Sequence, residues 1–128
     1  MEIPRRLVEI RYSKNMHKVI KMFNVHTYQW RDHISVLIMT LDGESCCKLQ
    51  IYDNEPNLAY ISDLYVSPRQ RCKGIGSEMI KYCEEYAKNK GCLKISLISD
   101  IDNWTREWYK KIGYNEVSSQ VLFEKEID

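Results

Sequence analysis

The 128-residue chain is poor in the features that mark non-globular proteins. It has only 5 glycines and 3 prolines, which excludes collagen-like and linker-like chains. Charged residues make up 29% and hydrophobic residues 44% of the chain, so we expect an ordered globular protein and not a disordered one. Because domains commonly run to ~100–150 residues, residues 1–128 are expected to form a single domain.

Charge of one sign, long apolar runs and paired cysteine motifs are also missing. With 19 Lys and Arg against 18 Asp and Glu, the chain lacks the strong positive field of many nucleic-acid-binding proteins. The longest uncharged apolar run, Ile34–Leu41, is far shorter than the ~20 residues of a membrane span, and no signal-peptide core follows Met1. The 5 cysteines include no Cys-x-x-Cys pair, and the 3 histidines form no ligand pattern with them. We therefore expect a cytoplasmic protein with free thiols and no metal site, and neither nucleic acid nor membrane among its partners.

Hydrophobic periodicity predicts a series of strands along the chain. The expected strands are Leu7–Tyr12, Ile34–Leu41, Cys47–Tyr52, Leu58–Val66, Leu93–Ser99, Tyr114–Val117 and Val121–Glu126. Turn signals at Asp42-Gly43 and Asn54–Asn57 separate three of these strands by short connections. These three strands are therefore expected to form an antiparallel meander.

Near the N-terminus, the spacing of apolar residues predicts a helix that is capped by Ser13. Its apolar positions follow the i, i+3, i+4, i+7 pattern and are Met16, Val19, Ile20 and Phe23. The next segment, His26–His33, is polar and aromatic without a clear period. We expect it to be a loop or a short helical turn.

Two further helices are expected on either side of the strand Leu93–Ser99. One opens at Gly74 and runs to about Lys90, and the other is capped by Asp102 or Asn103. A strand–helix–strand crossover normally makes its two strands parallel, whereas the meander is antiparallel. The expected fold class is therefore α+β: an α/β sandwich with a mixed, mostly antiparallel sheet, a central parallel pair and helices on both faces.

A basic, glycine-containing segment joins the strand that ends at Val66 to the helix that opens at Gly74. Helix N-termini carry unpaired N–H groups and a partial positive charge, and glycine lets a ligand approach the backbone closely. The segment adds three basic side chains: Arg69, Arg71 and Lys73. This combination predicts an anion site for a phosphate group. The Walker sequence is absent, and Met79 occupies the third-glycine position of a dinucleotide-binding fingerprint.

Three motifs in this order resemble those of the GCN5-related N-acetyltransferases (GNATs). They match the family's patterns Leu-x-Val-x-Pro, Arg/Gln-x-x-Gly-x-Gly/Ala and Phe-Tyr-x-Lys-x-Gly-Phe. The matching stretches are Leu64-Tyr65-Val66-Ser67-Pro68, Arg71-Cys72-Lys73-Gly74-Ile75-Gly76 and Trp108-Tyr109-Lys110-Lys111-Ile112-Gly113-Tyr114. The resemblance covers about Ile34 to Tyr114. It implies the GNAT fold and the transfer of an acetyl group from the cosubstrate acetyl-CoA to an amine by direct attack.

The resemblance also implies where acetyl-CoA would bind. Its pantetheine arm would pair along Leu64, Tyr65 and Val66, where this strand splays from its neighbour, and an N–H near Val66 would polarise the thioester carbonyl. Asn103 would contact the same arm after a one-residue shift, or Asp102-Asn103 is only a helix cap. The pyrophosphate would lie on the backbone amides of Arg71, Cys72, Lys73, Gly74, Ile75, Gly76 and Ser77.

Tyr109 matches the family's general acid, which protonates the leaving thiolate. The alternative is that Tyr109 belongs to the core, but the expected apolar stripe of its helix runs beside it, through Trp104, Trp108 and Ile112. Asp63 is the one carboxylate of the strand before the glycine segment, and we consider it as the general base. Its alternative is a solvated residue near a strand end.

The acceptor amine is not readable from the sequence. In the family, the region of Tyr28, Trp30 and His33 shapes the acceptor pocket, and an aromatic pocket suits a cationic amine. The same cluster could instead be core or the surface of a homodimer. Two alternatives to an acetyltransferase are a non-catalytic acyl-CoA-binding or regulatory domain of the same fold and a nucleotide-binding module that uses the same anion site.

Overall fold

The computed structural model describes residues 5–11, 18–31, 33–98, 103–117 and 122–127. In β1, the first part of β2, the first two residues of α2 and the first two of β8, only the backbone is described. The elements in chain order are β1 (Arg5–Arg11), β2 (Lys18–Trp30), β3 (Ile34–Leu41), β4 (Ser45–Tyr52), β5 (Leu58–Tyr65), the 3-10 helix η1 (Pro68–Gln70), α1 (Ile75–Asn89), β6 (Lys94–Ile98), α2 (Asn103–Lys111), β7 (Asn115–Glu116) and β8 (Leu122–Glu126).

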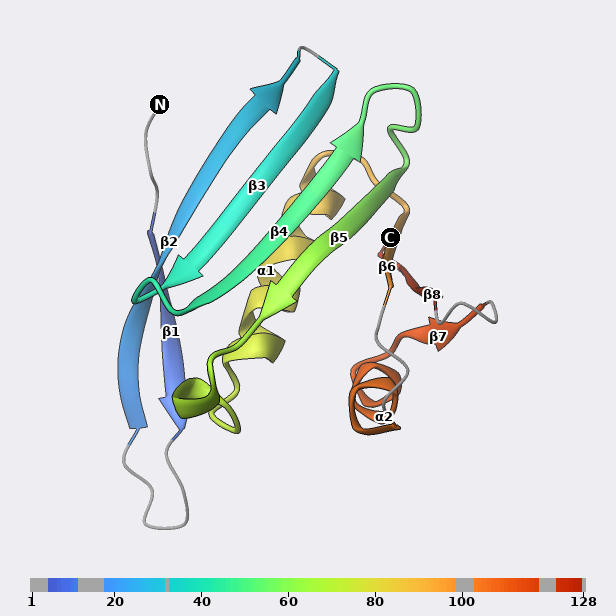
Figure 1. The fold of residues 1–128 in the computed structure, drawn as a ribbon. Helices are drawn as coiled ribbons and strands as arrows, with labels where there is room; N and C mark the ends of the chain where they lie inside the picture. Colours follow the sequence, from blue (N-terminus) through green and yellow to red (C-terminus); the bar gives the residue numbers. More distant parts are fainter. Residues whose placement is uncertain (1–4, 12–17, 32, 99–102, 118–121, 128) are drawn as a thin grey trace.

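The described strands form one mixed sheet of eight strands in the order β1-β2-β3-β4-β5-β6-β8-β7. All neighbours are antiparallel except β5 and β6, which are parallel and joined through α1. Figure 1 shows α1 behind β4 and β5, and α2 beside the C-terminal strands. The predicted α+β fold with its meander and central parallel pair is confirmed.

The predicted helix that was to carry Val19, Ile20 and Phe23 is wrong, because these residues lie in the long strand β2. Its expected cap, Ser13, lies outside the described residues. The loop expected at His26–His33 is also wrong as far as Trp30, since β2 continues to that residue. Phe23 and Val25 are fully buried, whereas Asn24 between them is exposed. This alternation is typical of a strand with one face on the core. It outweighs the helical spacing, which only four residues of this segment follow.

The core lies on the face of the sheet that α1 covers. In β4, the buried residues Cys47, Leu49 and Ile51 alternate with half-buried ones, as predicted, and the odd-numbered residues of β3 pair with them. Helix α1 contributes its own buried side chains, namely Ile75, Met79, Ile80, Cys83 and Ala87. Tyr109 of α2 and Tyr114 belong to the same buried cluster. Neither described helix is long and apolar enough to cross a membrane.

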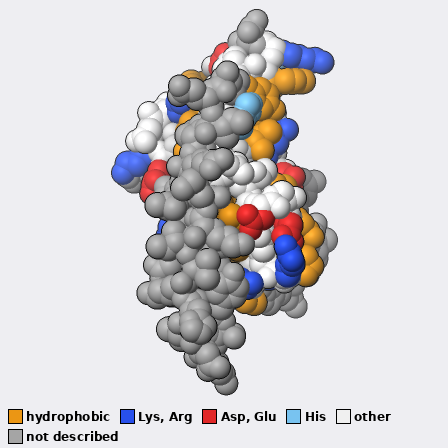
Figure 2. Space-filling model, turned by 90° about the vertical axis from the view of Figure 1, so that its left-hand side faces the viewer, with side chains coloured by type: hydrophobic (Ala, Val, Ile, Leu, Met, Phe, Trp, Pro, Cys, Tyr) orange, Lys and Arg blue, Asp and Glu red, His pale blue; other side chains and the backbone are white. Residues whose placement is uncertain are grey.

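Charges of both signs are interspersed on the described part of the face that Figure 2 shows, which is the side of β1 and β2. The balanced composition of the chain is thus visible on this face as a mixed surface.

A β-bulge in β5 sets the geometry of the region described below. Lys48 pairs with Asp63 but the next residue of β4, Leu49, pairs with Ile61, so Ser62 is the extra residue. Before the bulge, the odd-numbered residues of β5 face the core, and after it the even-numbered Leu64 packs against the core. The bulge therefore turns Asp63 to the opposite face of the sheet.

Candidate active site

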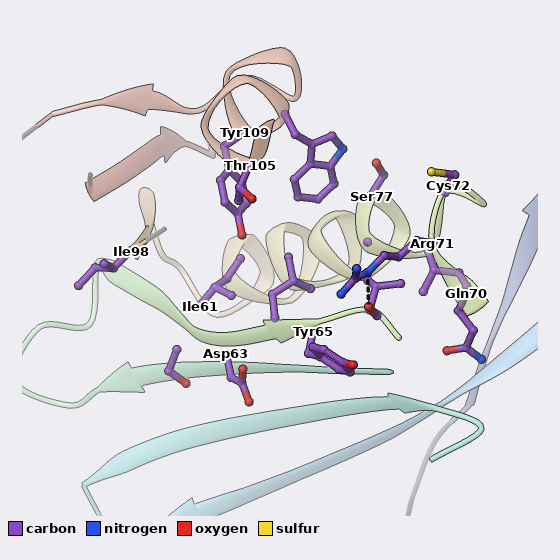
Figure 3. A pocket seen from close by; sticks show the side chains of 17 residues that line it. Ile61, Asp63, Tyr65, Gln70, Arg71, Cys72, Ser77, Ile98, Thr105 and Tyr109 are labelled. Carbon is purple, nitrogen blue, oxygen red and sulfur yellow. Dashed lines mark hydrogen bonds between the residues drawn. The ribbon is translucent and has the colours of Figure 1, made fainter. Parts of the chain in front are cut away.

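A cavity of about 850 Å³ opens where β5 separates from β6. The parallel register of the two strands ends at the pair Ile61 and Leu97, although β5 continues to Tyr65. Figure 3 shows the cavity between β5, the start of α1 and α2. Its lining comes from the second half of β5, the segment before α1, the first turn of α1, the end of β6 and one side of α2. The sequence prediction that this strand splays from its neighbour agrees with this register.

The second half of β5 presents a free strand edge to the cavity. Leu64, Tyr65 and Val66 all line it, and within the described residues this part of β5 has no partner on the β6 side. The Arg71 Nε donates a hydrogen bond of 2.9 Å to the carbonyl oxygen of Val66. The Arg71 guanidinium also lies 6.0 Å from the centre of the Tyr65 ring. Arg71 thus ties the strand end to the segment that leads into α1, and the edge itself stays available to an extended ligand.

The N-terminus of α1 closes one end of the cavity. Gly74 precedes the helix in the left-handed conformation with a φ of 82°, and no side chain of the described residues caps this end. The first intrahelical bond runs from the Glu78 N–H to the Gly74 carbonyl oxygen. The N–H groups of Ile75, Gly76 and Ser77 precede that bond and line the cavity, so they are positioned to bind an anion.

Gly76 also has a packing role that the motif alone did not reveal. A Cβ atom at this position would lie 3.2 Å from Cη2 of Trp108 and 3.5 Å from Cγ2 of Val66. The absence of a side chain therefore lets α2 approach the first turn of α1 closely. Gly76 thus allows α1 and α2 to pack closely at the cavity wall, and it also leaves the backbone open to a ligand.

The three basic residues before α1 have different positions, although the sequence analysis grouped them. Arg71 lines the cavity. Arg69 is exposed and binds Glu44 through a 2.6 Å hydrogen bond from Nε, and this carboxylate raises the pKa of Arg69. The Lys73 Nζ donates a 2.7 Å bond to the carbonyl oxygen of Arg69, and the Lys73 side chain is not among the described residues that line the cavity. Of the three, only Arg71 brings its positive charge to the cavity wall.

Cys72 lies on the cavity wall between Arg71 and Gly74 and is exposed. Its φ of 61° is unusual for a residue other than glycine. Together with Gly74, it gives the segment two left-handed residues within three positions. The segment is therefore sharply turned just before the helix.

Tyr109 is both a cavity residue and a core residue. It is 6% exposed, and its ring lies 5.0 Å from that of Trp108 and 6.2 Å from that of Tyr114. Tyr109 does not lie beside the apolar side of α2 as expected, because it is itself part of the buried core, whereas Trp108 and Ile112 pack half-buried against that core. The helix packs on two sides, with Trp108 on Gly76 and Tyr109 toward Tyr114. Figure 3 shows the Tyr109 side chain pointing from α2 toward β5.

Asp63 lines the same cavity from the other side of β5. It is exposed, and in Figure 3 it points away from Tyr109. The Cys46 Sγ lies 3.8 Å from Oδ2 of Asp63, and burial, followed by the negative charge of Asp63, raises the pKa of the Cys46 thiol. Tyr109 and Asp63 therefore flank the free edge of β5 from opposite faces of the sheet.

Other residues singled out in the sequence lie elsewhere. Asn103 is the first residue of α2, but its side chain and the whole of Asp102 lie outside the described residues. Trp30 and His33 have ring centres 6.2 Å apart at the turn between β2 and β3, and neither they nor Tyr28 are among the described residues that line the cavity. Within the described part of the chain, no group of three His, Cys, Asp or Glu side chains could hold a metal ion.

The sequence analysis missed Gln70, a buried polar residue of the cavity wall. Gln70 is 5% exposed and is the last residue of the 3-10 helix that follows β5. Its amide contacts Ser45 and Asp42, at the turn between β3 and β4. A glutamine in a basic loop has no periodicity that would mark it as buried, so only the tertiary contact identifies it.

Comparison with known families now places the chain. The model of the acetyltransferase (GNAT) family matches residues 9–114. The chain belongs to the acetyltransferase (GNAT) family. The match includes β2, for which the motifs had indicated no resemblance, and it ends at Tyr114 after α2.

Two curated relatives of this GNAT chain differ in how much of it they match. A thialysine N-epsilon-acetyltransferase from Bos taurus is 37% identical over 60 residues, which are 46% of this chain and 35% of the relative. The matched stretch thus spans about a third of the length of that relative. An aminoglycoside N(6′)-acetyltransferase type 1 from Acinetobacter haemolyticus is 20% identical over 124 residues, or 94% of this chain and 83% of the relative.

Solved structures agree with the GNAT fold. A Bacillus anthracis structure with bound acetyl coenzyme A superposes with a TM-score of 0.62 at 20% identity, over 97% of this chain and 84% of that one. The PaiA N-acetyltransferase from Thermoplasma acidophilum, solved with coenzyme A, has a TM-score of 0.60 at 24% identity, over 73% and 61% of the two chains. At these identities, the likeness supports the shared fold.

Proposed function

We propose that this protein is an N-acetyltransferase that transfers an acetyl group from acetyl-CoA to an amine of a small molecule or protein. The observation that carries the proposal is the free edge of β5 beyond the bulge at Ser62, which opens onto the same cavity as the uncapped N-terminus of α1. An extended ligand with an anionic end fits both parts of this site. Family membership supports the same conclusion.

Acetyl-CoA would be held by backbone groups along most of this path. The amides from Arg71 to Ser77, at the uncapped end of α1, would bind the pyrophosphate, with Arg71 adding its charge. The edge at Leu64, Tyr65 and Val66 would pair with the amides of the pantetheine arm as an added strand would. Asn103 at the start of α2 is a further candidate contact for this arm.

Tyr109 is the proposed general acid. Bound acetyl-CoA supplies an activated acyl group, whose transfer forms an N–C bond and breaks the C–S bond. A phenol held at the cavity wall can donate its proton to the sulfur as that bond breaks. The N–H near Val66, on the same strand edge, would stabilise the negative charge that develops on the carbonyl oxygen.

Asp63 is the proposed general base, because an ammonium group must lose a proton before its nitrogen can attack. It lines the cavity on the side of β5 opposite to Tyr109, so proton removal and proton donation would take place on two sides of the reacting bond. Asp63→Asn keeps the size of the side chain and removes the base. We expect turnover to fall by ~10²-fold near neutral pH, the scale of one acid–base group, and to recover partly at higher pH as the free amine becomes abundant.

The proposal is tested by release of free thiol from acetyl-CoA in the presence of a panel of amines. Thialysine and aminoglycosides start the panel, because relatives are named for them, and polyamines, amino acids and peptide amines complete it. Calorimetry on the same sample measures the affinity for acetyl-CoA. Binding with turnover of at least one amine is the expected result. Binding without turnover would favour a non-catalytic acyl-CoA-binding domain, and a preference for ATP over acetyl-CoA would favour a nucleotide-binding module.

A further inference from the structure

Two buried polar side chains join the turn between β3 and β4 to the segment that follows β5. Ser45 is 1% exposed and Gln70 is 5% exposed. The Ser45 hydroxyl donates to Oε1 of Gln70 and accepts a 2.9 Å hydrogen bond from the backbone N–H of Ser67. Nε2 of Gln70 lies 3.4 Å from Oδ2 of Asp42 and donates to it. We call the pair Ser45 and Gln70, with these bonds, the Ser45–Gln70 clamp.

We infer that the Ser45–Gln70 clamp positions the anion-binding segment for acetyl-CoA, which makes Ser45 and Gln70 positioning residues of the reaction. The inference rests on the proposed function. Neither residue belongs to the three motifs quoted above, and Ser45 does not line the cavity. Ser45 would therefore affect the binding of acetyl-CoA only through its hydrogen bonds to Gln70 and to the backbone of Ser67.

The segment needs such support because of its shape. The link from the free edge of β5 to α1 includes a 3-10 helix, and two of its last residues, Cys72 and Gly74, have φ angles of 61° and 82°. Left-handed residues other than glycine persist where surrounding contacts hold them. The clamp fixes the start of this link to the core sheet, and the bond from Arg71 to Val66 fixes its middle. The amides at the start of α1 are thereby held in place before a ligand binds.

Burial makes the clamp stiffer than the contacts around it. A buried hydroxyl or amide that loses its partner is costly, so the clamp holds its geometry strongly. Outside it, the half-buried Glu44 accepts hydrogen bonds from the exposed Arg69 and from the Ser67 hydroxyl. Exposed ion pairs contribute little, since water screens them. The inference therefore predicts that the buried pair, and not the ion pair above it, controls the affinity for acetyl-CoA.

The test compares Ser45→Ala with Ser35→Ala, a control that removes the same kind of hydrogen bond at a more exposed position. Ser35 lies on β3, and its hydroxyl likewise donates to the Oε1 of a glutamine, Gln29, but at a turn away from the cavity. Calorimetry measures the dissociation constant for acetyl-CoA, and steady-state kinetics measure kcat and KM. Removing a buried partner should raise the dissociation constant and KM for acetyl-CoA about tenfold in Ser45→Ala. kcat at saturation should stay within about twofold, because Tyr109 lies on a different element.

Hydrogen exchange of the ligand-free protein gives a readout that does not depend on the cofactor. Ser45→Ala should speed exchange of the Ser67 and Gln70 amides about tenfold, because the Ser67 amide loses its acceptor and the Gln70 amide donates to the Ser67 carbonyl. Ser35→Ala should leave both exchange there and cofactor affinity unchanged, and Arg69→Ala should change the affinity by less than about twofold. If Ser45→Ala does not fold, Gln70→Met is measured in its place with the same expected results.

The outcomes separate the inference from the proposed function. Wild-type protein that binds no acetyl-CoA contradicts the proposed function, and the exchange rates still decide whether the clamp holds the segment. Wild-type protein that binds acetyl-CoA, together with a folded clamp variant of equal affinity, overturns the inference alone. Lower melting temperature with unchanged exchange and affinity would mean a purely structural role and would also overturn it.

Discussion

The two halves of β5 differ in their neighbours. Residues 58–61 pair with β6, residues 59–61 pair with β4 as well, and Ala59 is fully buried. Beyond the bulge at Ser62, residues 63–65 pair with β4 alone, and Tyr65 is 46% exposed. The first half thus belongs to the core, whereas the second half forms a wall of the cavity. The bulge at Ser62 and the end of pairing with β6 at Ile61 thus divide β5 into a segment that stabilises the core and a segment that could bind a ligand.

This difference shows how the fold obtains a ligand-binding edge without an exposed edge strand. A strand edge at the rim of a sheet invites pairing with other chains. Here the free edge lies in the interior of the sheet order, inside a cavity, with Trp108 and Tyr109 of α2 on one side. Substitutions near the second half of β5 should therefore change acetyl-CoA affinity or turnover. Substitutions near the first half should change the stability of the fold.

The largest effect on stability is expected from a substitution in β4, opposite the first half of β5. Leu49 pairs with Ile61 and is fully buried. Leu49→Ala should lower the free energy of unfolding by ~2–5 kcal/mol, because it leaves a cavity in the core. The affinity of the folded fraction for acetyl-CoA should not change. Denaturant unfolding and calorimetry measure the two quantities, and a loss of affinity at unchanged stability would erase the distinction between the two halves.

Tyr109→Phe tests the chemistry next to the second half of β5. The ring stays in the core and only the hydroxyl is lost, so kcat should fall ~10²-fold, or ~2.7 kcal/mol in the barrier, while acetyl-CoA affinity stays constant. Tyr114→Phe is the matched control, since Tyr114 is also buried but does not line the cavity. Full activity in Tyr109→Phe would mean that solvent or another residue protonates the thiolate.

Gly76→Glu should weaken acetyl-CoA binding at least about tenfold, or ~1.4 kcal/mol, because it places bulk and negative charge at the start of α1. The contact of this position with Trp108 requires a second variant, since any side chain there presses on α2. Gly76→Ala adds that contact without the charge. If Gly76→Ala alone causes the whole loss, displacement of Trp108 is the cause and the anion site is not supported. Calorimetry and melting temperatures of both variants decide.

The smallest effect is expected at Tyr114, away from the cavity. Its hydroxyl donates a 3.0 Å hydrogen bond to Glu84, which also binds Lys125, so Tyr114→Phe should cost ~1 kcal/mol of stability at neutral pH. Burial, followed by the charge of Glu84, raises the pKa of Tyr114 well above its ordinary value. The unfolded chain therefore releases this proton from about pH 10 upward while the folded protein keeps it, and stability falls as pH rises.

The measurement for Tyr114 is denaturant unfolding between neutral pH and about pH 11. The wild-type protein should lose stability more steeply above about pH 10 than Tyr114→Phe does. Equal slopes would show that the Tyr114 proton does not distinguish the folded from the unfolded state.

Much of the fold could be predicted because local patterns agree with tertiary structure. The alternation in β4, the turn at Asp42 and Gly43 and the glycine-opened α1 each have one physical interpretation, and the structure follows all three. In β2, a short helical spacing competed with a strand pattern that only the neighbouring strands stabilise. Nothing local favours one over the other strongly, so the long antiparallel hairpin was missed.

The candidate site was predictable to the extent that it rests on backbone features. A strand end, glycines and a helix start can be read from residue types, and the structure brings them to one cavity. The bulge at Ser62 could not be read, because strict alternation would place Asp63 on the core face with Ile61. The burial of Gln70 depends on Ser45, which is distant in the chain, and the burial of Tyr109 depends on the core cluster that the sheet and α1 form. Long-range contacts of this kind leave no periodic signal.

The most direct test of the account is hydrogen exchange along β5 and α1 with and without acetyl-CoA. At a cofactor concentration about ten times the dissociation constant, exchange should slow about tenfold for amides of Ser62–Val66 and of Arg71–Ser77. Residues 59–61, already paired on both sides, should not change. Protection of both segments with none in the first half of β5 is the predicted result. Equal effects on the two halves, or protection confined to other strands, would contradict the assignment of the free edge of β5 as the binding site for acetyl-CoA.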